Sequence, residues 1–303
     1  MKIGNRTIKV IFWGSSQFSI HILNNLKENG ILPDLIITTP PKPQGRGLIM
    51  TPNIVETWAK TNNISCLAPV RLKDSFDEIN KEKWDLSIVA SYGKIIPEDI
   101  LNIPKYKSIN IHPSLLPKYR GPSPLQSAIL DDQKNTGVSI MLMDKEMDHG
   151  PVVSQSEIIV DEWTEYEKFE ENMAIAGSKL ILETIIPWID SSIVAKEQIH
   201  SEATFTRKFE KEDGFVDLGK DDPYLIFRKY CAFHIWPNIF FDIKFDESKT
   251  ERFKITSLKY NVDGLKIIKV RGQNGKEINF SDLLNQLKGS EQYKNLQRFL
   301  LSQ

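Results

Sequence analysis

The sequence predicts an α/β protein with two parts: a Rossmann-like, mostly parallel sheet with helices on both faces, and a smaller β-rich domain that resembles an OB-like barrel. Two observations support this fold class. In the first 190 residues, short apolar runs alternate with segments of helical spacing, an order typical of right-handed βαβ units. After residue 206, short strand-like runs recur with turn residues between them, which favours a small barrel.

The first strand and helix illustrate the pattern. The apolar run IKVIFWG at 8–14 precedes residues 17–29, whose apolar side chains recur at helical spacing. The same order predicts further strands at 34–39, 85–93, 107–113, 136–144 and 152–160, and further helices at 52–63, 97–103, 123–133 and 163–189. Segment 152–160 alternates apolar and polar residues over part of its length, so we expect it at an edge of the sheet.

A change of pattern predicts the domain boundary. Residues 190–206 are polar and lack sustained periodicity, so we place a linker at 191–206 between an amino-terminal domain at 1–190 and a carboxyl-terminal domain at 207–303. The second domain carries predicted strands at 239–243, 253–260, 264–270 and 276–280. From Glu251 to the end the local charge is +5, so the formal net charge of −1 conceals a basic carboxyl-terminal part.

Composition excludes several classes of protein. A chain of 303 residues that is 40% hydrophobic and 26% charged can bury a core, and its near-neutral charge excludes a strong global cationic field. Cys66 and Cys231 lie far apart without a CxxC pair, so we expect structural thiols, no metal site and a reducing cytosol. No apolar stretch is long enough to span a membrane, and the short amino-terminal run lacks a signal-peptide pattern, so we expect a cytoplasmic protein.

Three polar residues near predicted strand ends are candidates for catalysis. Ligands of an open parallel sheet bind at the carboxyl ends of its strands, where Asn110 and His112 are expected, and Asp148 follows the next strand after a turn. An amide donor and an imidazole oriented by a carboxylate can stabilise an oxyanion and move a proton without a covalent nucleophile. From spacing alone, a structural histidine remains the stronger interpretation.

Two longer motifs change this balance. The run NIHPSLLPKYRGPSP at 110–124, followed by MDKEMDHG at 143–150, closely resembles the signature of the folate-dependent formyltransferases. This resemblance implies that Asn110, His112 and Asp148 form the catalytic set and that 10-formyltetrahydrofolate is the co-substrate, without a metal. It also implies that folate is held by two loops, which comprise Ser114, Leu115, Leu116 and Pro117 in one and Ser91, Tyr92 and Gly93 in the other.

Within that superfamily the chain most resembles the methionyl-tRNA formyltransferases. The segment KPQGRGLIMTP at 42–52 is similar to the loop with which that family contacts the acceptor end of tRNA, which implies RNA contacts by Lys42 and Arg46. The start of the last domain, including Trp236-Pro237, is also similar. The resemblance implies formyl transfer to the α-amino group of methionyl initiator tRNA by a catalytic domain at 1–190 and a tRNA-binding domain at 207–303, in a monomer without membrane contact.

Departures from the family pattern leave alternatives open. His149 stands where the family usually has Thr, and the final domain is shorter than typical. The added imidazole could perturb the Asp148 carboxylate, although we expect it to face solvent. A folate-dependent amino-sugar N-formyltransferase would keep the same three catalytic residues, and a non-catalytic folate-binding or RNA-binding paralogue is a more remote interpretation.

Overall fold

The computed structural model describes residues 2–3, 6–44, 47–245, 249–273, 275–288 and 293. The chain divides into two compact units. Unit 1 comprises Met1–Pro124, Asn135–Val160 and Glu170–Arg207, and unit 2 comprises Leu125–Lys134, Asp161–Phe169 and Lys208–Gln303. The predicted bounds at 1–190, 191–206 and 207–303 divide a continuous chain, whereas each compact unit collects segments from separate parts of the sequence. Those bounds therefore stay a prediction.

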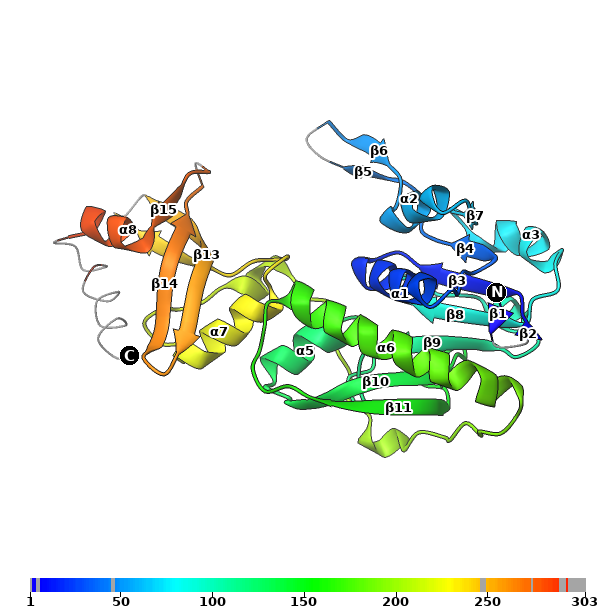
Figure 1. Cartoon of the computed structure of the whole chain (residues 1–303). Coiled ribbons are helices and arrows are strands. Elements are labelled where there is room, and N and C mark those ends of the chain that lie inside the picture. Colours follow the sequence, from blue (N-terminus) through cyan, green and yellow to red (C-terminus); the bar gives the residue numbers. More distant parts are fainter. Residues whose placement is uncertain are drawn as a thin grey trace. The chain divides into compact units, whose positions relative to one another are not determined.

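Unit 1 is built on a seven-stranded sheet with the order β11-β10-β9-β8-β3-β4-β7 (Figure 1). The strands are β3 (Val10–Gly14), β4 (Leu35–Ile37), β7 (Ser65–Leu67), β8 (Leu86–Ala90), β9 (Ser108–His112), β10 (Asn135–Leu142) and β11 (Val152–Ile159). Five of them are parallel, while β10 runs antiparallel to both of its neighbours. The predicted mostly parallel sheet and the edge position of 152–160 are both confirmed.

Among the residues that the structure describes, five helices are associated with this sheet, two of which begin where the sequence supplies capping groups. They are α1 (Gln17–Glu28), α2 (Ile54–Thr61), α3 (Phe76–Asn80), α4 (Glu98–Leu101) and α6 (Tyr166–Ile189), the last of which begins in unit 2 and continues into unit 1. Ser16 and Ser19 form a reciprocal capping box at the start of α1, and the Asn53 side chain accepts from the Val55 amide in α2. These bonds satisfy amides that the first helical turn leaves unpaired.

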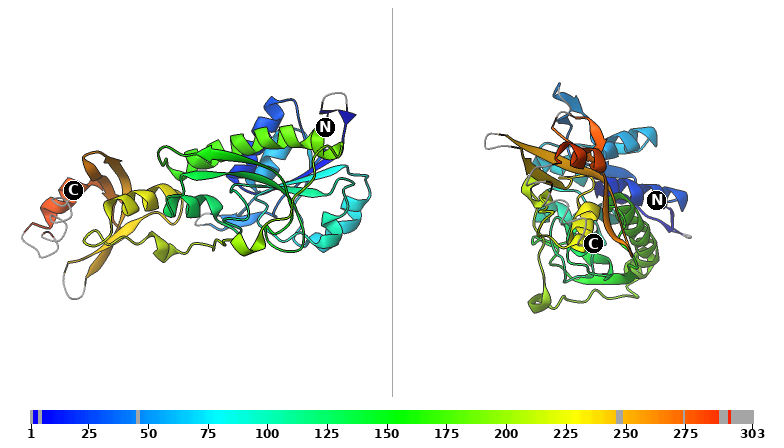
Figure 2. Two further views of the ribbon diagram at one scale, coloured as in Figure 1. Left: turned by 90° about the horizontal axis from the view of Figure 1, so that it is seen from below. Right: turned by 90° about the vertical axis from the view of Figure 1, so that its left-hand side faces the viewer.

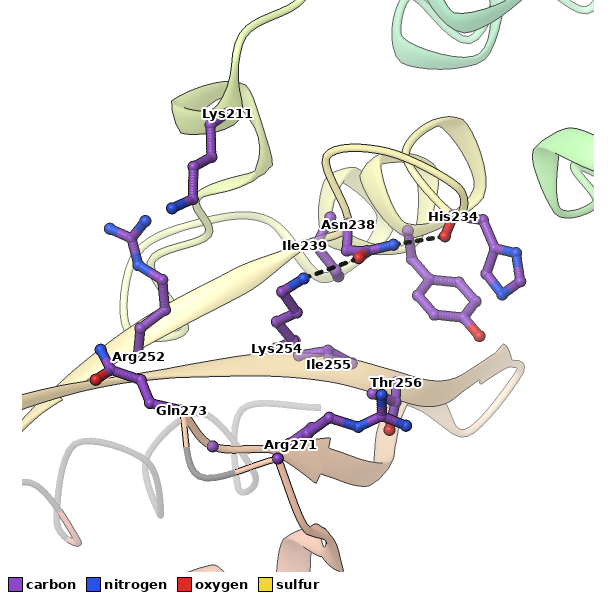
Figure 3. Close-up of a pocket in the computed structure, with 13 residues that line it drawn as sticks. Lys211, His234, Asn238, Ile239, Arg252, Lys254, Ile255, Thr256, Arg271 and Gln273 are labelled. Carbon is purple, nitrogen blue, oxygen red and sulfur yellow. Dashed lines mark hydrogen bonds between the residues drawn. The ribbon is translucent and has the colours of Figure 1, made fainter. Parts of the chain in front are cut away.

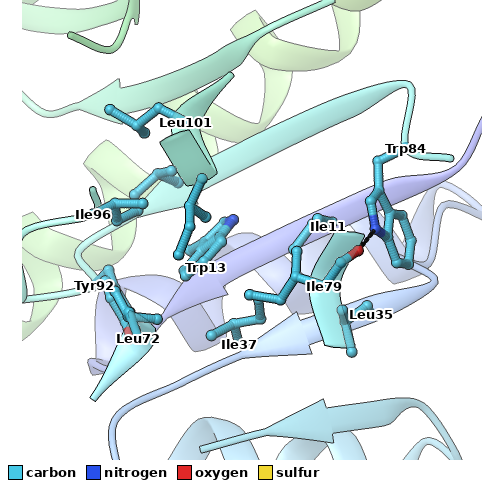
Figure 4. Packing of buried hydrophobic residues seen from close by; sticks show 12 residues of the cluster. Ile11, Trp13, Leu35, Ile37, Leu72, Ile79, Trp84, Tyr92, Ile96 and Leu101 are labelled. Atoms are coloured by element: carbon cyan, nitrogen blue, oxygen red, sulfur yellow. Dashed lines mark hydrogen bonds between the residues drawn. The ribbon is translucent and has the colours of Figure 1, made fainter. Parts of the chain in front are cut away.

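One face of the sheet carries a large apolar cluster (Figure 4). Trp13 on β3 and Ile37 on β4 lie on this face and pack with Tyr92, with Ile79 from α3 and with Leu101 from α4. The Trp13 ring is 1% exposed, and burial of a side chain of this kind contributes roughly 1.5–3 kcal/mol to folding. The cluster therefore fixes the strands that lead to the polar residues described below.

Helices α1 and α6 cover the opposite face, and two glycines permit their close approach (Figure 2). A Cβ atom at Gly14 would lie 2.5 Å from the Ser19 hydroxyl oxygen in α1. A Cβ atom at Gly177 in α6 would lie 2.7 Å from a methyl carbon of Ile111 in β9. Both distances are shorter than a packed Cβ contact, so larger residues would push these helices away from the sheet.

Unit 2 contains a four-stranded antiparallel sheet in the order β12-β13-β14-β15. Its strands are β12 (Phe240–Lys244), β13 (Thr250–Asn261), β14 (Gly264–Arg271) and β15 (Glu277–Asn279). Its helices are α5 (Pro124–Leu130), α7 (Pro223–Ala232) and α8 (Phe280–Gln286), and α5 belongs to unit 2 from Leu125 onward. The prediction of a second, β-rich domain is confirmed. Within the described part of the chain, the pairings run from β12 to β15 without a bond that closes a barrel.

Partly buried polar contacts join the separate segments of unit 2. Asp132 accepts hydrogen bonds from Trp163 Nε1 at 2.6 Å and from the Tyr224 hydroxyl at 2.9 Å. Asp132 follows α5, Trp163 precedes α6 and Tyr224 lies in α7. One carboxylate therefore ties together residues that are distant in the sequence, which explains why compactness and chain order give different boundaries.

Two short antiparallel hairpins complete the described fold. Strands β1 (Lys2–Ile3) and β2 (Arg6–Thr7) form one of them, and β5 (Lys42–Gln44) and β6 (Ile49–Thr51) form the other. The second hairpin occupies the segment for which the sequence predicted a loop. Across the described ranges, no helix combines the length and apolar character needed to cross a bilayer.

Candidate active site

Asn110 and His112 lie on one face of β9 because they are two residues apart in a strand. The register pairs Asn110 with Val89 on β8, and Val89 pairs with Trp13 on β3. Residues paired in register point to the same face, so Asn110 and His112 share the face of the apolar cluster. Both are nearly buried, with 9% and 4% of their surfaces exposed.

Asp148 reaches these two residues from the loop that joins β10 to β11. Its Oδ1 atom lies 3.5 Å from Asn110 Nδ2 and 3.6 Å from His112 Nδ1, and its Oδ2 atom accepts from the Gly121 amide at 2.7 Å. Strand β10 is antiparallel to β9, so its carboxyl end lies beside the start of β9. The loop must therefore cross back over the sheet face to bring Asp148 to His112. We call Asn110, His112 and Asp148 the triad.

The position of His112 fixes one of its ring protons. His112 Nε2 lies 3.0 Å from the carbonyl oxygen of Tyr119. A carbonyl oxygen can only accept a hydrogen bond, so Nε2 carries a proton and donates it there. Nδ1 then faces the Asp148 carboxylate. An amide donor, an imidazole nitrogen and a carboxylate oxygen thus meet within 3.6 Å, and this set can bind a developing oxyanion and accept or return a proton.

The loop after His112 is shaped by Ser139 of β10. The Ser139 hydroxyl donates to the Ser114 carbonyl at 2.6 Å and accepts from the Leu116 amide at 3.1 Å. The Ser114 hydroxyl donates to the Lys118 carbonyl at 2.7 Å. Ser114 and Leu116 are buried, whereas Leu115 and Pro117 are partly exposed. Ser114 and Leu116 therefore stabilise the loop from inside, and the side chains of Leu115 and Pro117 are accessible to a ligand at its surface.

The second predicted folate loop follows β8. Ser91 and Gly93 are exposed and have φ values of +52° and +76°, so the chain turns sharply between them. The Ser15 hydroxyl donates to the Tyr92 carbonyl at 2.7 Å. The Tyr92 side chain is buried against Trp13, and burial raises the pKa of its phenol to about 12. Tyr92 can therefore offer its backbone to a ligand, while its ring belongs to the core.

The two predicted RNA-contacting residues lie on the β5–β6 hairpin. Lys42 is exposed at the start of β5 and pairs with Thr51. Arg46 lies outside the described residues. The hairpin exposes an apolar group that composition did not indicate: Leu48, Ile49 and Met50 are 71%, 72% and 60% exposed.

The structure also adds residues that the sequence interpretation missed. Arg120 is 3% exposed and Gln198 is 6% exposed, and both are connected to the Asp148 loop. Arg120 stands in the quoted motif, whereas Gln198 stands in the polar segment predicted as a linker and carries no local signal. His149 does not merely face solvent: its ring stacks on His200 at 4.2 Å, and its Nδ1 lies 2.8 Å from Asp144 Oδ2.

Comparison with known proteins identifies the family of this chain. The formyl transferase family model matches residues 6–185. The chain belongs to the formyltransferase family. It is 35% identical to a methionyl-tRNA formyltransferase of Sulfurihydrogenibium over 88% of this chain and 87% of the relative, and 37% identical to that of Thermotoga neapolitana over 70% and 69%. These relatives establish a formyl-transferring enzyme.

A solved structure supports the fold alone. The crystal structure of HypX from Aquifex aeolicus in complex with tetrahydrofolic acid matches with a TM-score of 0.65 and 16% identity. The match covers 94% of this chain and 48% of that one. Within the described ranges, no group of three or more His, Cys, Asp and Glu side chains is arranged to hold a metal ion.

Proposed function

We propose that this formyltransferase moves the formyl group of 10-formyltetrahydrofolate to the α-amino group of methionyl initiator tRNA. The observation that carries this proposal is the triad, in which amide, imidazole and carboxylate atoms meet within 3.6 Å on one sheet face. The names of the curated relatives favour methionyl-tRNA as the acceptor. The solved sugar N-formyltransferases are only 17–20% identical to this chain, so they favour no sugar acceptor.

The reaction needs no nucleophile from the protein. The neutral amine attacks the formyl carbon, a C–N bond forms, and the carbonyl oxygen takes up negative charge. The bond from carbon to the folate nitrogen then breaks, and that nitrogen receives the proton that the attacking amine loses. Asn110 Nδ2 and a protonated His112 stabilise the oxyanion, while Asp148 orients His112 and accepts or returns the travelling proton.

The residues near the triad suit a folate co-substrate. The partly exposed Leu115 and Pro117 offer apolar surface in the loop after His112, and the exposed turn at Ser91 and Gly93 offers backbone groups. Tyr92 positions that turn through its buried ring. When bound, the folate supplies the activated formyl group and the leaving nitrogen. The protein residues bind it, orient it and exclude water from the reacting carbon.

Two features of the chain suit an RNA substrate. The exposed Leu48, Ile49 and Met50 of the β5–β6 hairpin can pack against unpaired bases, and the positive charges of Lys42 and Arg46 in the same segment suit phosphate groups. Unit 2 contains a cavity of about 610 Å³ that we call the basic cavity (Figure 3). It is lined by Lys211, Tyr230, His234, Asn238, Ile239, Arg252, Lys254, Ile255, Thr256, Arg271, Gly272, Gln273 and Gly275.

The cationic side chains that line the basic cavity differ in how far neighbouring carboxylates neutralise them. Arg252 is neutralised by Asp242 at 3.0 Å and Glu212 at 3.3 Å, and its guanidinium lies 3.8 Å from the centre of the Phe240 ring. Lys254 contacts the neutral Asn238 side chain at 3.2 Å, and Arg271 meets Glu277 at the longer distance of 3.6 Å. Lys254 and Arg271 are therefore better suited than Arg252 to a phosphate group of the tRNA.

The test offers the protein a single formyl donor and, in separate incubations, different formyl acceptors. Incubation of the protein with 10-formyltetrahydrofolate and, separately, methionyl initiator tRNA, methionyl elongator tRNA and nucleotide-linked amino sugars will show which acceptor releases tetrahydrofolate. We expect release with the initiator tRNA and formylated methionine in the recovered product. Formylation of a sugar without formylation of either tRNA would contradict the proposal. The predicted cytoplasmic location and monomeric state belong to the same proposal.

A further inference from the structure

The Asp148 carboxylate depends on an exposed loop for its position. Lys145, Glu146 and Met147 are exposed, and Asp148 itself has a φ of +50°, in the left-handed region that Asp adopts more readily than most residues. The backbone conformation of Asp148 is therefore accessible but not fixed by the loop itself, and contacts outside the loop can hold it. The hydrogen bond from the Gly121 amide fixes one carboxylate oxygen, but it does not fix the main chain.

Gln198 supplies the missing contact with the main chain. Its side-chain nitrogen donates to the Asp148 carbonyl at 3.0 Å and to the Gly150 carbonyl at 2.7 Å. These two bonds span the residue that follows Asp148. Gln198 is 6% exposed, so water competes weakly for the same carbonyl groups.

Arg120 determines which way the Gln198 amide points. Its Nε and Nη2 atoms donate to Gln198 Oε1 at 3.1 and 2.7 Å. A guanidinium can only donate, so the oxygen of Gln198 must face Arg120 and the nitrogen must face the loop. Gly121, the residue after Arg120, donates its amide to Asp148 Oδ2. Arg120 thus holds the main chain of Asp148 through Gln198, and Gly121 holds the carboxylate of Asp148 directly.

A stacked pair of histidines, His149 and His200, makes a second set of contacts with the same loop. Arg120 Nη2 also donates to His200 Nδ1 at 2.9 Å, and the His200 ring lies parallel to that of His149 at 4.2 Å. His149 Nδ1 in turn lies 2.8 Å from Asp144 Oδ2, within the same loop. The residue that departs from the family pattern is therefore bound on one side to the loop and on the other to the Arg120 network.

We propose that Gln198, supported by the His149–His200 stack, is a positioning residue that holds the Asp148 carboxylate against His112. This inference rests on the proposed function, because it assigns Asp148 a part in formyl transfer. Gln198 acts through the backbone of Asp148, because its side-chain amide bonds to Arg120 and to the carbonyl groups of Asp148 and Gly150. The predicted linker segment therefore contributes to catalysis.

The decisive variant is Gln198→Glu. The new side chain has the same size and keeps an acceptor for Arg120, but its second oxygen faces the carbonyl groups of Asp148 and Gly150. Replacing a donor with an acceptor there releases the loop without opening a cavity. Glu197→Gln is the matched control, because it makes the reverse exchange at the adjacent exposed position. His149→Phe is a second variant that keeps the ring stack and removes the bond to Asp144.

We expect Gln198→Glu to lower kcat about tenfold to a hundredfold, because small displacements of a reacting group have effects of this size. KM for both substrates and the thermal unfolding midpoint should stay near those of Glu197→Gln. His149→Phe should lower kcat less. An unchanged kcat in Gln198→Glu, or a loss of kcat that only parallels a fall in the unfolding midpoint, would overturn the proposal.

A measurement without substrates separates this inference from the proposed function. The ¹⁵N chemical shifts of the His112 ring, assigned with His112→Asn, report whether Asp148 faces Nδ1. We expect them to change in Gln198→Glu and to stay unchanged in Glu197→Gln. Unchanged shifts in Gln198→Glu would refute positioning. If wild-type protein formylates no methionyl-tRNA while the shifts still respond to Gln198→Glu, the proposed function fails and the positioning contact stands.

Discussion

The triad of unit 1 and the basic cavity of unit 2 both gather polar side chains, but they hold them differently. Asn110 and His112 are nearly buried, and His112 is bonded at Nε2 to a backbone carbonyl. Lys254 and Arg271 are exposed, and they reach the cavity on long flexible side chains. The first arrangement costs conformational freedom during folding, whereas the second retains that freedom until a ligand binds.

This difference indicates two kinds of contribution. A reacting group must be fixed before the substrate arrives, because a preorganised donor needs no rearrangement as charge develops. A cation that attracts a phosphate can act over a range of positions, because its effect depends mainly on charge and salt. We therefore expect substitutions in the triad to change kcat and substitutions in the basic cavity to change affinity.

The largest expected effect is that of His112→Asn. Loss of one preorganised oxyanion donor should lower kcat on the order of 10²–10³-fold, while tRNA affinity stays near that of the wild type. Steady-state formylation and a filter-binding measurement together check this outcome. His21→Asn, a substitution at the outer side of α1, is the control. A variant that lost affinity instead of kcat would contradict the assignment of His112 to chemistry.

The two thiols provide a second comparison between the units. Burial raises the pKa of Cys66 in β7 to about 11 and that of Cys231 in α7 to about 12. A raised thiol pKa leaves less thiolate at a given pH. At pH 8, Cys66 should therefore react with iodoacetamide on the order of a hundredfold more slowly than a free cysteine, and Cys231 on the order of a thousandfold more slowly. Cys231 should be the slower of the two.

Peptide mass spectrometry over time measures these alkylation rates. Unfolding in guanidinium should make both cysteines react at similar, fast rates, because burial is then lost. Rapid alkylation of Cys231 in the folded protein would show that unit 2 opens more readily than its buried contacts indicate.

The smallest expected effect is that of Lys254→Ala combined with Arg271→Ala. Removal of two phosphate contacts should weaken tRNA binding about tenfold and lower the slope of log K against log salt by about two. The value of kcat at saturating tRNA should remain near that of the wild type. Lys145→Ala with Lys179→Ala, two exposed lysines of unit 1, is the matched control. An unchanged slope of log K against log salt would show that the basic cavity does not contact the tRNA.

Much of the fold could be predicted because its signals are local. The apolar run before Gly14 predicts a buried strand, and helical spacing after it predicts α1. The observed bounds of β3 and α1 differ from the predicted bounds by at most two residues. The β5–β6 hairpin was not predicted, because Pro43 and the run Gly45-Arg46-Gly47 give no alternation of apolar and polar side chains.

The site was predictable to a smaller extent. Asn110 and His112 are two residues apart in a strand, so their shared face follows from the sequence alone. Asp148 was a candidate because it follows the next predicted strand, and the resemblance strengthened that prediction. Its contact with His112 did not follow from strand order, since β10 runs antiparallel to β9 and its carboxyl end lies away from His112. Nothing local indicated Gln198, because a polar residue in a segment without periodicity reads as solvent-exposed.

The sequence by itself determined the α/β class, the apolar strands and the identity of the groups that could do chemistry, because each depends on residues close together in the chain. The tertiary structure alone decided that the Asp148 loop crosses the sheet face, that Arg120 orients Gln198 and that His149 stacks on His200. These contacts join residues 50 to 80 positions apart, and such pairings depend on the packing of the whole unit rather than on any local preference.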